Sequence, residues 1–267
     1  MAGLSRFIEV LRLFDTGIPG NAESWTVPGM AAALSAPSST LYRTVRELTK
    51  AGFLEQAGEA HYRLGPAFIE FERLLRLNDP LVRLGRDVIA DLLRQAAVPS
   101  VALMARLYNG EVMCVADEAA PTAGFRSSYE RGRPMPMTRG ATSKVILANL
   151  QPRELTRLIG PRGSTIELRK ELQAIRRAGF MATASEIDPG LAGIAAPVVI
   201  SEAGITASLT LVCEEAALDD AARRRLILLV VSAASLLTEA IRRESAAPPP
   251  RPAAPEPQTS RRKRRSN

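Results

Sequence analysis

The residues best suited to chemistry lie on a predicted helix that runs from about residue 38 to Lys50. Its apolar side carries Leu41, Val45 and Leu48. Its polar side is made of Ser39, Tyr42, Arg43, Arg46 and Lys50. Short hydroxyl side chains at the start of a helix can approach base edges in the major groove, and arginine can bond guanine or phosphate. This pattern favours a DNA recognition helix, and an ordinary solvated surface helix is the alternative interpretation.

The elements that must position this helix surround it in the sequence. Thr26 can cap a preceding helix, and the stretch 35–37 ends that helix because a proline disfavours helical geometry in the residue before it. Ser38 or Ser39 then caps the second helix, and Gly52 closes it. Alternating residues 53–55 and 61–64 around the turn at Gly58 predict a β-hairpin. A helix over residues 4–14 is expected to pack behind this unit.

The order helix, turn, helix and hairpin is that of a winged helix-turn-helix. We therefore predict a DNA-binding domain over residues 1–65. The expected DNA contacts are Thr26, Ser38, Ser39, Thr40, Tyr42, Arg43, Arg46 and Lys50. Residues 1–65 carry six basic and six acidic residues, so the domain has no net charge and its affinity for phosphate must come from the distribution of charge.

Composition limits the other classes of function. The chain has 267 residues, a formal net charge of +7, one histidine and two cysteines. With a single histidine, a histidine-based catalytic triad is not expected, and the two cysteines lack the spacing of metal ligands. No apolar run is long enough to span a membrane. We expect a cytoplasmic chain with no catalytic residues, no metal, no cofactor and no membrane partner.

The second half of the chain predicts an α+β domain over residues 80–245. Asn109-Gly110 is a strong turn signal between two alternating runs. One helix is expected at the start of the domain, and further helices are expected over about 139–150, 152–160, 167–178 and 219–244. The expected strands cover 101–107, 111–116, 194–200 and 205–213, with an extended stretch at 180–187. This pattern predicts an antiparallel sheet with helices on one face.

Two segments lie outside these domains. Residues 66–79 predict an apolar linker helix, which either packs on its own chain or forms a dimer seam; we favour the seam. Residues 246–267 are rich in proline and alanine and contain five consecutive basic residues at 261–265, which predicts a disordered basic tail. The tail either has no function or strengthens DNA binding through phosphate attraction.

Four motifs in order resemble the IclR family of bacterial transcriptional regulators. They are TVPGMAAALSAPSSTLYRTVRELTKAGFLE, YRLGP, GRPMPMTRGATSKVILANL and GFMATASEIDPGLAGIAAPV. The resemblance covers residues 4–243. It implies a winged helix-turn-helix, a linker helix and a GAF-like effector-binding domain. It further implies a homodimer or dimer of dimers that binds a double-stranded operator and responds to a small organic or aromatic acid, as a repressor or activator.

The resemblance and the residue types together predict an effector site in the second domain. Small residues at the start of a helix leave backbone N–H groups free for a carboxylate, and methionines supply an adaptable apolar wall. The expected effector residues are Met135, Met137, Arg139, Gly140, Ala141, Thr142, Lys144, Glu186, Gly193, Ile194 and Ala195. Gly193 replaces a cysteine that many members have, which suggests a roomier or differently shaped pocket. The alternative is a capped helix that merely packs closely.

Two further functions stay open at this point. The chain could be a metabolite-binding protein or an enzyme with a vestigial DNA-binding head, or a constitutive regulator with an empty pocket. The expected function is a sequence-specific transcriptional regulator, and we expect it to control a catabolic operon.

Overall fold

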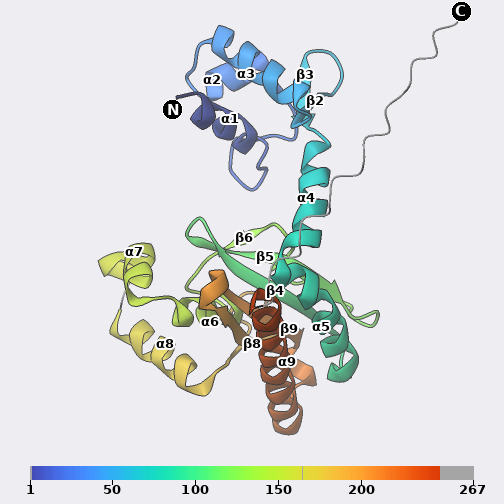
Figure 1. Ribbon diagram of the computed structural model, residues 1–267, viewed down its shortest axis with the longest axis vertical. Helices are drawn as coiled ribbons and strands as arrows, with labels where there is room; N and C mark the ends of the chain where they lie inside the picture. The colour runs from blue at the N-terminus through green and yellow to red at the C-terminus, as the bar shows by residue number, and fades with distance from the viewer. Residues whose placement is uncertain (1, 164, 247–267) are drawn as a thin grey trace, which may run out of the picture. The chain divides into compact units, whose positions relative to one another are not determined.

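The computed structural model describes residues 2–163 and 165–246, so the predicted basic tail lies outside the described residues apart from Ala246. The chain divides into two compact units, one ending at Arg83 and the other starting at Leu84 (Figure 1). Among the described residues, no helix combines the length and apolar character needed to cross a membrane.

The first unit contains three helices and a small sheet, followed by a fourth helix. Its elements are α1 (Ala2–Arg12), β1 (Trp25–Thr26), α2 (Val27–Ala33), α3 (Ser38–Lys50), β2 (Leu54–Gln56), β3 (His61–Leu64) and α4 (Ala67–Asn78). The sheet is antiparallel in the order β1-β3-β2. The expected helices and hairpin are present in the expected order. The short strand β1 is an addition, which pairs Trp25 with Tyr62 on the hairpin.

The starts of α2 and α3 differ in how they are capped. The backbone N–H of Gly29 donates to Thr26 Oγ1 (3.1 Å), so Thr26 caps α2 as expected. The expectation that Ser38 or Ser39 caps α3 is wrong. Pro37 occupies the cap position, its carbonyl accepts from the N–H of Thr40 (3.0 Å), and no side chain caps the helix. Both serines therefore lie inside the first helical turn.

A single apolar core holds α3 in place. Leu41, Val45 and Leu48 on its inner side are buried against Met30 of α2 and Val10 of α1. Because these residues fix the helix on one side, its polar side must face outward. Two residues separate the end of β3 from the start of α4, and Phe53 stacks on Phe71 of α4 with ring centroids 5.5 Å apart.

The second unit contains a six-stranded antiparallel sheet in the order β6-β5-β4-β9-β8-β7. Its strands are β4 (Ser100–Tyr108), β5 (Glu111–Ala119), β6 (Pro134–Met135), β7 (Met181–Ala184), β8 (Leu191–Ile200) and β9 (Ile205–Glu214). Its helices are α5 (Pro80–Ala96, which begins just before the unit), α6 (Ala141–Asn149), α7 (Pro152–Gly163), α8 (Ile166–Ala178) and α9 (Asp220–Ala246). The Asn109-Gly110 turn between β4 and β5 is confirmed, with φ of 48° and 85°.

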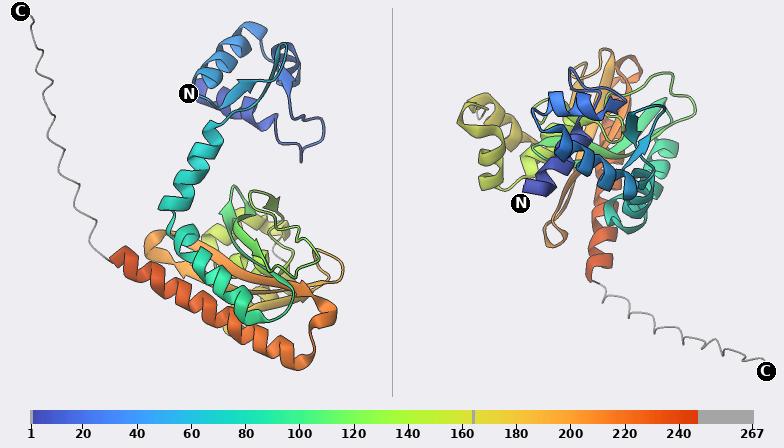
Figure 2. Two further views of the ribbon diagram at one scale, coloured as in Figure 1. Left: turned by 90° about the vertical axis from the view of Figure 1, so that its right-hand side faces the viewer. Right: turned by 90° about the horizontal axis from the view of Figure 1, so that it is seen from above.

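Helices cover both faces of this sheet, so the expectation of helices on one face is wrong. Leu103 and Ala105 of β4 lie in the core cluster that contains α6. On the other face, Met104 meets Gly85 of α5, which also lies beside Leu237 of α9. Figure 2 shows α9 running along that side of the sheet. Burial on both faces explains why residues 100–105 are buried without alternation.

Candidate functional site

A groove of about 770 Å³ lies on the first unit between α3 and the hairpin. Its lining residues are Ser39, Tyr42, Arg43, Arg46, Thr49, Lys50, Gln56 and Tyr62. Five of the eight residues expected from the sequence are thus brought together. The other three lie elsewhere: Ser38 and Thr40 lie in the first turn of α3 without lining the groove, and the Thr26 hydroxyl is engaged in capping α2.

The hairpin supplies two groove residues that sequence reasoning missed. Gln56 of β2 and Tyr62 of β3 are direct cross-strand partners, so their side chains lie on the same face of the hairpin. The hairpin alternation in the sequence contained this information, because it assigns every second residue to one face. The groove therefore combines one wall from a helix and one from a two-stranded ribbon.

The cationic side chains of the groove are accessible. Among the described residues, Arg43 and Lys50 have no carboxylate within 4.0 Å. Arg46 lies 3.8 Å from Glu47, and both side chains are largely exposed, so this pair leaves the guanidinium available. The groove is concave and carries three exposed cations, hydroxyl groups and an exposed tyrosine. Cations of this kind can bind phosphate groups, and the hydroxyl groups and arginines can bond base edges.

A second hollow lies in the other unit, at the start of α6. It is a cavity of about 30 Å³ between α6, β7, β8 and the loops around residues 127–129 and 186–188. Five of the expected effector residues line it, namely Gly140, Ala141, Thr142, Glu186 and Gly193. A Cβ at Gly193 would fit at ordinary contact distances, 3.7 Å from Ala141 Cβ and 3.6 Å from Thr183 Oγ1, so the glycine leaves the volume of a small side chain unfilled beside the cavity.

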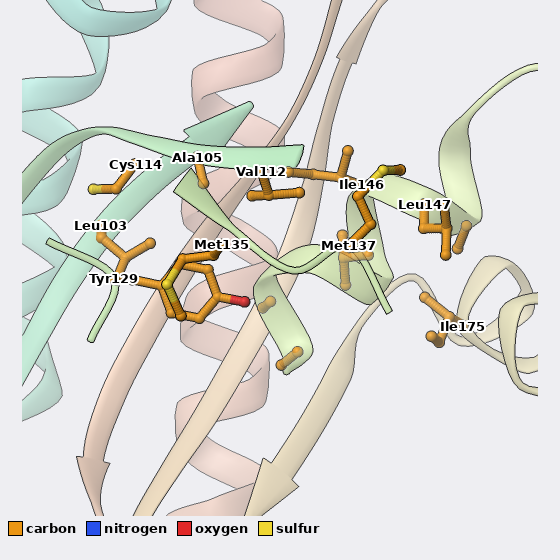
Figure 3. Packing of buried hydrophobic residues seen from close by; sticks show 14 of the residues in the cluster. Leu103, Ala105, Val112, Cys114, Tyr129, Met135, Met137, Ile146, Leu147 and Ile175 are labelled. Atoms are coloured by element: carbon orange, nitrogen blue, oxygen red, sulfur yellow. The ribbon is translucent and has the colours of Figure 1, made fainter. Parts of the chain in front are cut away.

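Six expected effector residues do not line the cavity. Met135 and Met137 are buried in the core cluster (Figure 3). Ala195 belongs to the same cluster. Ile194 faces the opposite side of the sheet from Ala195. Ala195 pairs with Thr210, whose hydroxyl lies 3.0 Å from that of Thr142 on α6. Alternation along β8 therefore turns Ile194 away from α6.

Arg139 and Lys144, the remaining two, hold the cavity wall from outside. Arg139 donates to the backbone oxygen of Glu186 (2.7 Å). Lys144 Nζ lies 2.8 Å from Glu186 Oε1 and 2.9 Å from Glu171 Oε1 on α8. Burial lowers the pKa of Lys144, but hydrogen bonds and attraction from both glutamates outweigh this effect and raise the pKa above its ordinary value. Lys144 is therefore a charged structural bridge.

The cavity contains polar groups that sequence reasoning missed. Ser127, Tyr129, Thr183 and Asp188 line it. Tyr129 is buried, its hydroxyl oxygen lies 2.8 Å from Ser143 Oγ, and burial raises its pKa. These residues come from loops and from a strand far apart in the sequence, and no local pattern marks them. Together they add three hydroxyl groups and one carboxylate to the lining of the cavity.

The turn before α6 requires glycine. Gly140 has φ of 79°, and a Cβ there would lie 2.8 Å from Ile187 Cγ1 and 2.9 Å from the Tyr129 hydroxyl. We predict that Gly140→Ala lowers the free energy of unfolding by about 2 kcal/mol through backbone strain and these clashes. Urea unfolding measures the change. Gly124→Ala, at a site with no atom within 4 Å, is the control and is expected to change stability by less than about 0.5 kcal/mol; equal effects would contradict the assignment.

Both cysteines are buried and have unreactive thiols. Burial raises the pKa of Cys114 to about 12 and that of Cys213 to about 11. Because the thiolate is the reacting form, we predict that the folded chain gives no rapid reaction with a disulfide reagent at pH 8, whereas both thiols react in denaturant. Stoichiometric labelling of the folded chain would contradict this prediction. Within the described part of the chain, no group of three histidine, cysteine or acidic residues could hold a metal ion.

Comparisons with known proteins agree with this architecture. The chain is 26% identical over 203 residues to the HTH-type transcriptional regulator KipR of Bacillus subtilis, covering 72% of this chain and 80% of that protein. It is 23% identical over 185 residues to the transcriptional repressor IclR of Escherichia coli, covering 62% and 65%. A crystal structure of an IclR homolog from Microbacterium hydrocarbonoxydans, complexed with 4-hydroxybenzoate, has the same fold with a TM-score of 0.70, 21% identity and coverage of 90% and 99%.

The family model for the C-terminal part of the bacterial transcriptional regulator IclR matches residues 86–238. This match spans more than half of the chain and contains the whole sheet and the cavity. The chain therefore belongs to the IclR family of bacterial transcriptional regulators.

Proposed function

We propose that this regulator binds a specific DNA operator through the groove between α3 and the hairpin. In this proposal residues 1–65 are a winged helix-turn-helix domain, residues 66–79 a linker helix and residues 80–245 an effector-binding domain. The observation that carries the proposal is the grouping of Ser39, Tyr42, Arg43, Arg46 and Lys50 with Gln56 and Tyr62 around one open groove. Helix residues would reach base edges, while the hairpin side would hold a phosphate strand.

The proposed effector site is the cavity at the start of α6. Backbone N–H groups at the α6 N-terminus favour an anion, and the hydroxyl groups of Ser127, Tyr129 and Thr142 can orient its oxygen atoms. We infer that the effector is a small organic or aromatic acid. The 4-hydroxybenzoate bound by the Microbacterium relative is the first probe.

A homodimer, or a dimer of such dimers, is the proposed assembly. Helix α4 exposes Ile69, Leu75 and Leu77, at 71%, 59% and 50% of their surfaces. Exposed apolar side chains on one helix favour a seam with a second copy. Sedimentation of the full chain tests this part: a monomer at micromolar concentration would contradict it.

The proposal excludes catalysis and places the protein in the cytoplasm, where the chromosome is. Lys144, the one buried lysine among the described residues, is held between two carboxylates that raise its pKa and keep its amine protonated, so it is no nucleophile. The regulator would thus bind its effector without turning it over.

Selection from random-sequence duplexes tests DNA recognition. The full chain is expected to enrich one motif, and the enriched duplex then serves in a mobility-shift titration. Addition of 4-hydroxybenzoate, or of another acid from a panel, is expected to change the operator affinity at least about fivefold, as allosteric coupling typically does. Enrichment of no motif would contradict the proposed function, and a panel without effect would contradict the effector site.

A further inference from the structure

Residues 185–190 cross the cavity, and three consecutive side chains of this segment contact its far wall. Glu186 pairs with Lys144 of α6 (2.8 Å). Asp188 accepts hydrogen bonds from the backbone N–H of Ser128 (2.9 Å) and from the Ser128 hydroxyl. Between Glu186 and Asp188, the side chain of Ile187 lies directly over Gly140.

Ile187 limits the size of the cavity. The Cγ1 atom of Ile187 and the hydroxyl of Tyr129 lie within 3 Å of the point where a Cβ of Gly140 would be, so they fill the space over the first turn of α6. The remaining cavity of about 30 Å³ has room for about two water molecules. Pockets for larger organic ligands measure about 300 Å³ or more. An aromatic acid therefore does not fit in the cavity while Ile187 stays in this position.

The two ends of the segment are held together. Ser185 and Gly190 both have positive φ, 51° and 77°. The Ser185 hydroxyl accepts from the N–H of Gly190 (3.0 Å) and donates to Glu215 (2.9 Å), which ties the two ends together. Residues 185–190 thus form a compact surface loop whose ends lie close together.

The ion pair between Glu186 and Lys144 can break without leaving the Lys144 charge unpaired. When Glu186 withdraws, Lys144 keeps its partner Glu171 at 2.9 Å. Glu186 is itself one quarter exposed and can be solvated as it leaves. An ion pair whose buried member retains a second partner avoids the large penalty of an unpaired buried charge.

We propose that residues 185–190 are a lid over the effector cavity, that the contacts of Glu186 with Lys144 and Arg139 and of Asp188 with Ser128 hold it closed, and that Ile187 is the plug whose withdrawal sets which effectors enter. The role of Ile187 in selecting effectors by size rests on the proposed effector site. The lid formed by residues 185–190 does not depend on that site being used.

Thiol labelling tests the lid without any effector. The reporter is Ile187→Cys in the full chain, where both native cysteines are buried. Adding Asp188→Ala is expected to raise the labelling rate of the introduced thiol at least fivefold, and Ser128→Ala to raise it less, because the Ser128 backbone N–H remains. The matched control is Ile159→Cys, a similarly half-buried site on α7 that does not line the cavity. An unchanged rate at position 187, or an equal rise at position 159, would overturn the lid.

Calorimetric titration tests the plug. Acetate and 4-hydroxybenzoate are titrated into the wild-type chain, into Ile187→Ala and into the control Ile159→Ala. Ile187→Ala is expected to bind 4-hydroxybenzoate at least tenfold more tightly than wild type, with acetate changed less than threefold and the control unchanged. Equal or weaker binding of 4-hydroxybenzoate by Ile187→Ala would overturn the plug. If neither acid bound any variant while the labelling rates changed as expected, the proposed effector site would be contradicted and the lid supported.

Discussion

Replacement of Lys144 by methionine is expected to lower the free energy of unfolding by about 3 kcal/mol. Removing the ammonium group leaves the carboxylates of Glu171 and Glu186 facing one another without their common partner. Breaking a buried ion pair typically costs about 3–5 kcal/mol. The lower end applies because Glu171 and Glu186 keep 34% and 25% of their side-chain surface exposed. Urea unfolding followed by circular dichroism measures the loss.

Two controls separate charge from packing. Lys170→Met removes an equal charge from an exposed site on α8 and is expected to change stability by less than about 0.5 kcal/mol. The triple variant Lys144→Met, Glu171→Gln, Glu186→Gln is expected to recover most of the loss, since no buried charge remains unpaired. A triple variant as unstable as Lys144→Met alone would show that the lysine stem, and not its charge, is what matters.

The same ion cluster has a defined pH dependence. The pKa of Lys144 is raised above its ordinary value of 10.5, so its stabilising contribution is fully present below that value. The contribution is lost as the pH rises through the higher pKa of the folded chain. Between pH 6 and pH 9 the difference in stability between wild type and Lys144→Met is therefore expected to stay constant.

Arg43→Ala is expected to weaken operator binding by about 2 kcal/mol, which is about 30-fold in affinity. Arg43 lies on the outer side of α3 without a carboxylate partner among the described residues, where it can form a bidentate contact with a guanine edge. Such a loss is expected to relax specificity at one operator position, as measured by titrating single-base variants of the selected duplex.

Matched arginine variants sharpen this test. Arg63→Ala removes a hairpin arginine that is paired with Glu55 at 2.7 Å and does not line the groove. It is expected to change affinity less than threefold. Arg43→Lys keeps the charge but loses the planar fork, so it is expected to lose specificity more than affinity. Equal binding of all operator variants by wild type and Arg43→Ala would remove Arg43 from base recognition.

Local sequence signals predicted the elements of the fold well. Thr26 is a cap, and Asn109-Gly110 is a hairpin turn. Each of these features depends on a few neighbouring residues and their backbone preferences. The apolar side of α3 likewise follows from helical spacing, so the outward position of Arg43 could be derived without any structure.

Features that depend on distant residues were missed or wrong. To predict that helices cover the second face of the sheet, one would have to know that α5 and α9 pack against it. Tyr129 and Asp188 reach the cavity from separate loops, and Asp188 bonds Ser128 across 60 residues. Ile194 was grouped with its neighbours by motif, although the two-residue period of a strand places it on the other face from Gly193 and Ala195.

The salt dependence of DNA binding tests the central claim, that the groove between α3 and the hairpin is the surface that contacts DNA. The variant Arg43→Ala, Arg46→Ala, Lys50→Ala is compared with wild type and with the charge-matched variant Arg153→Ala, Arg157→Ala, Lys170→Ala on the selected duplex. Each lost phosphate contact flattens the slope of log affinity against log salt by about 0.9. The groove variant is expected to flatten it by about 2 and the matched variant to leave it unchanged. Identical slopes for the groove variant and wild type would contradict the account.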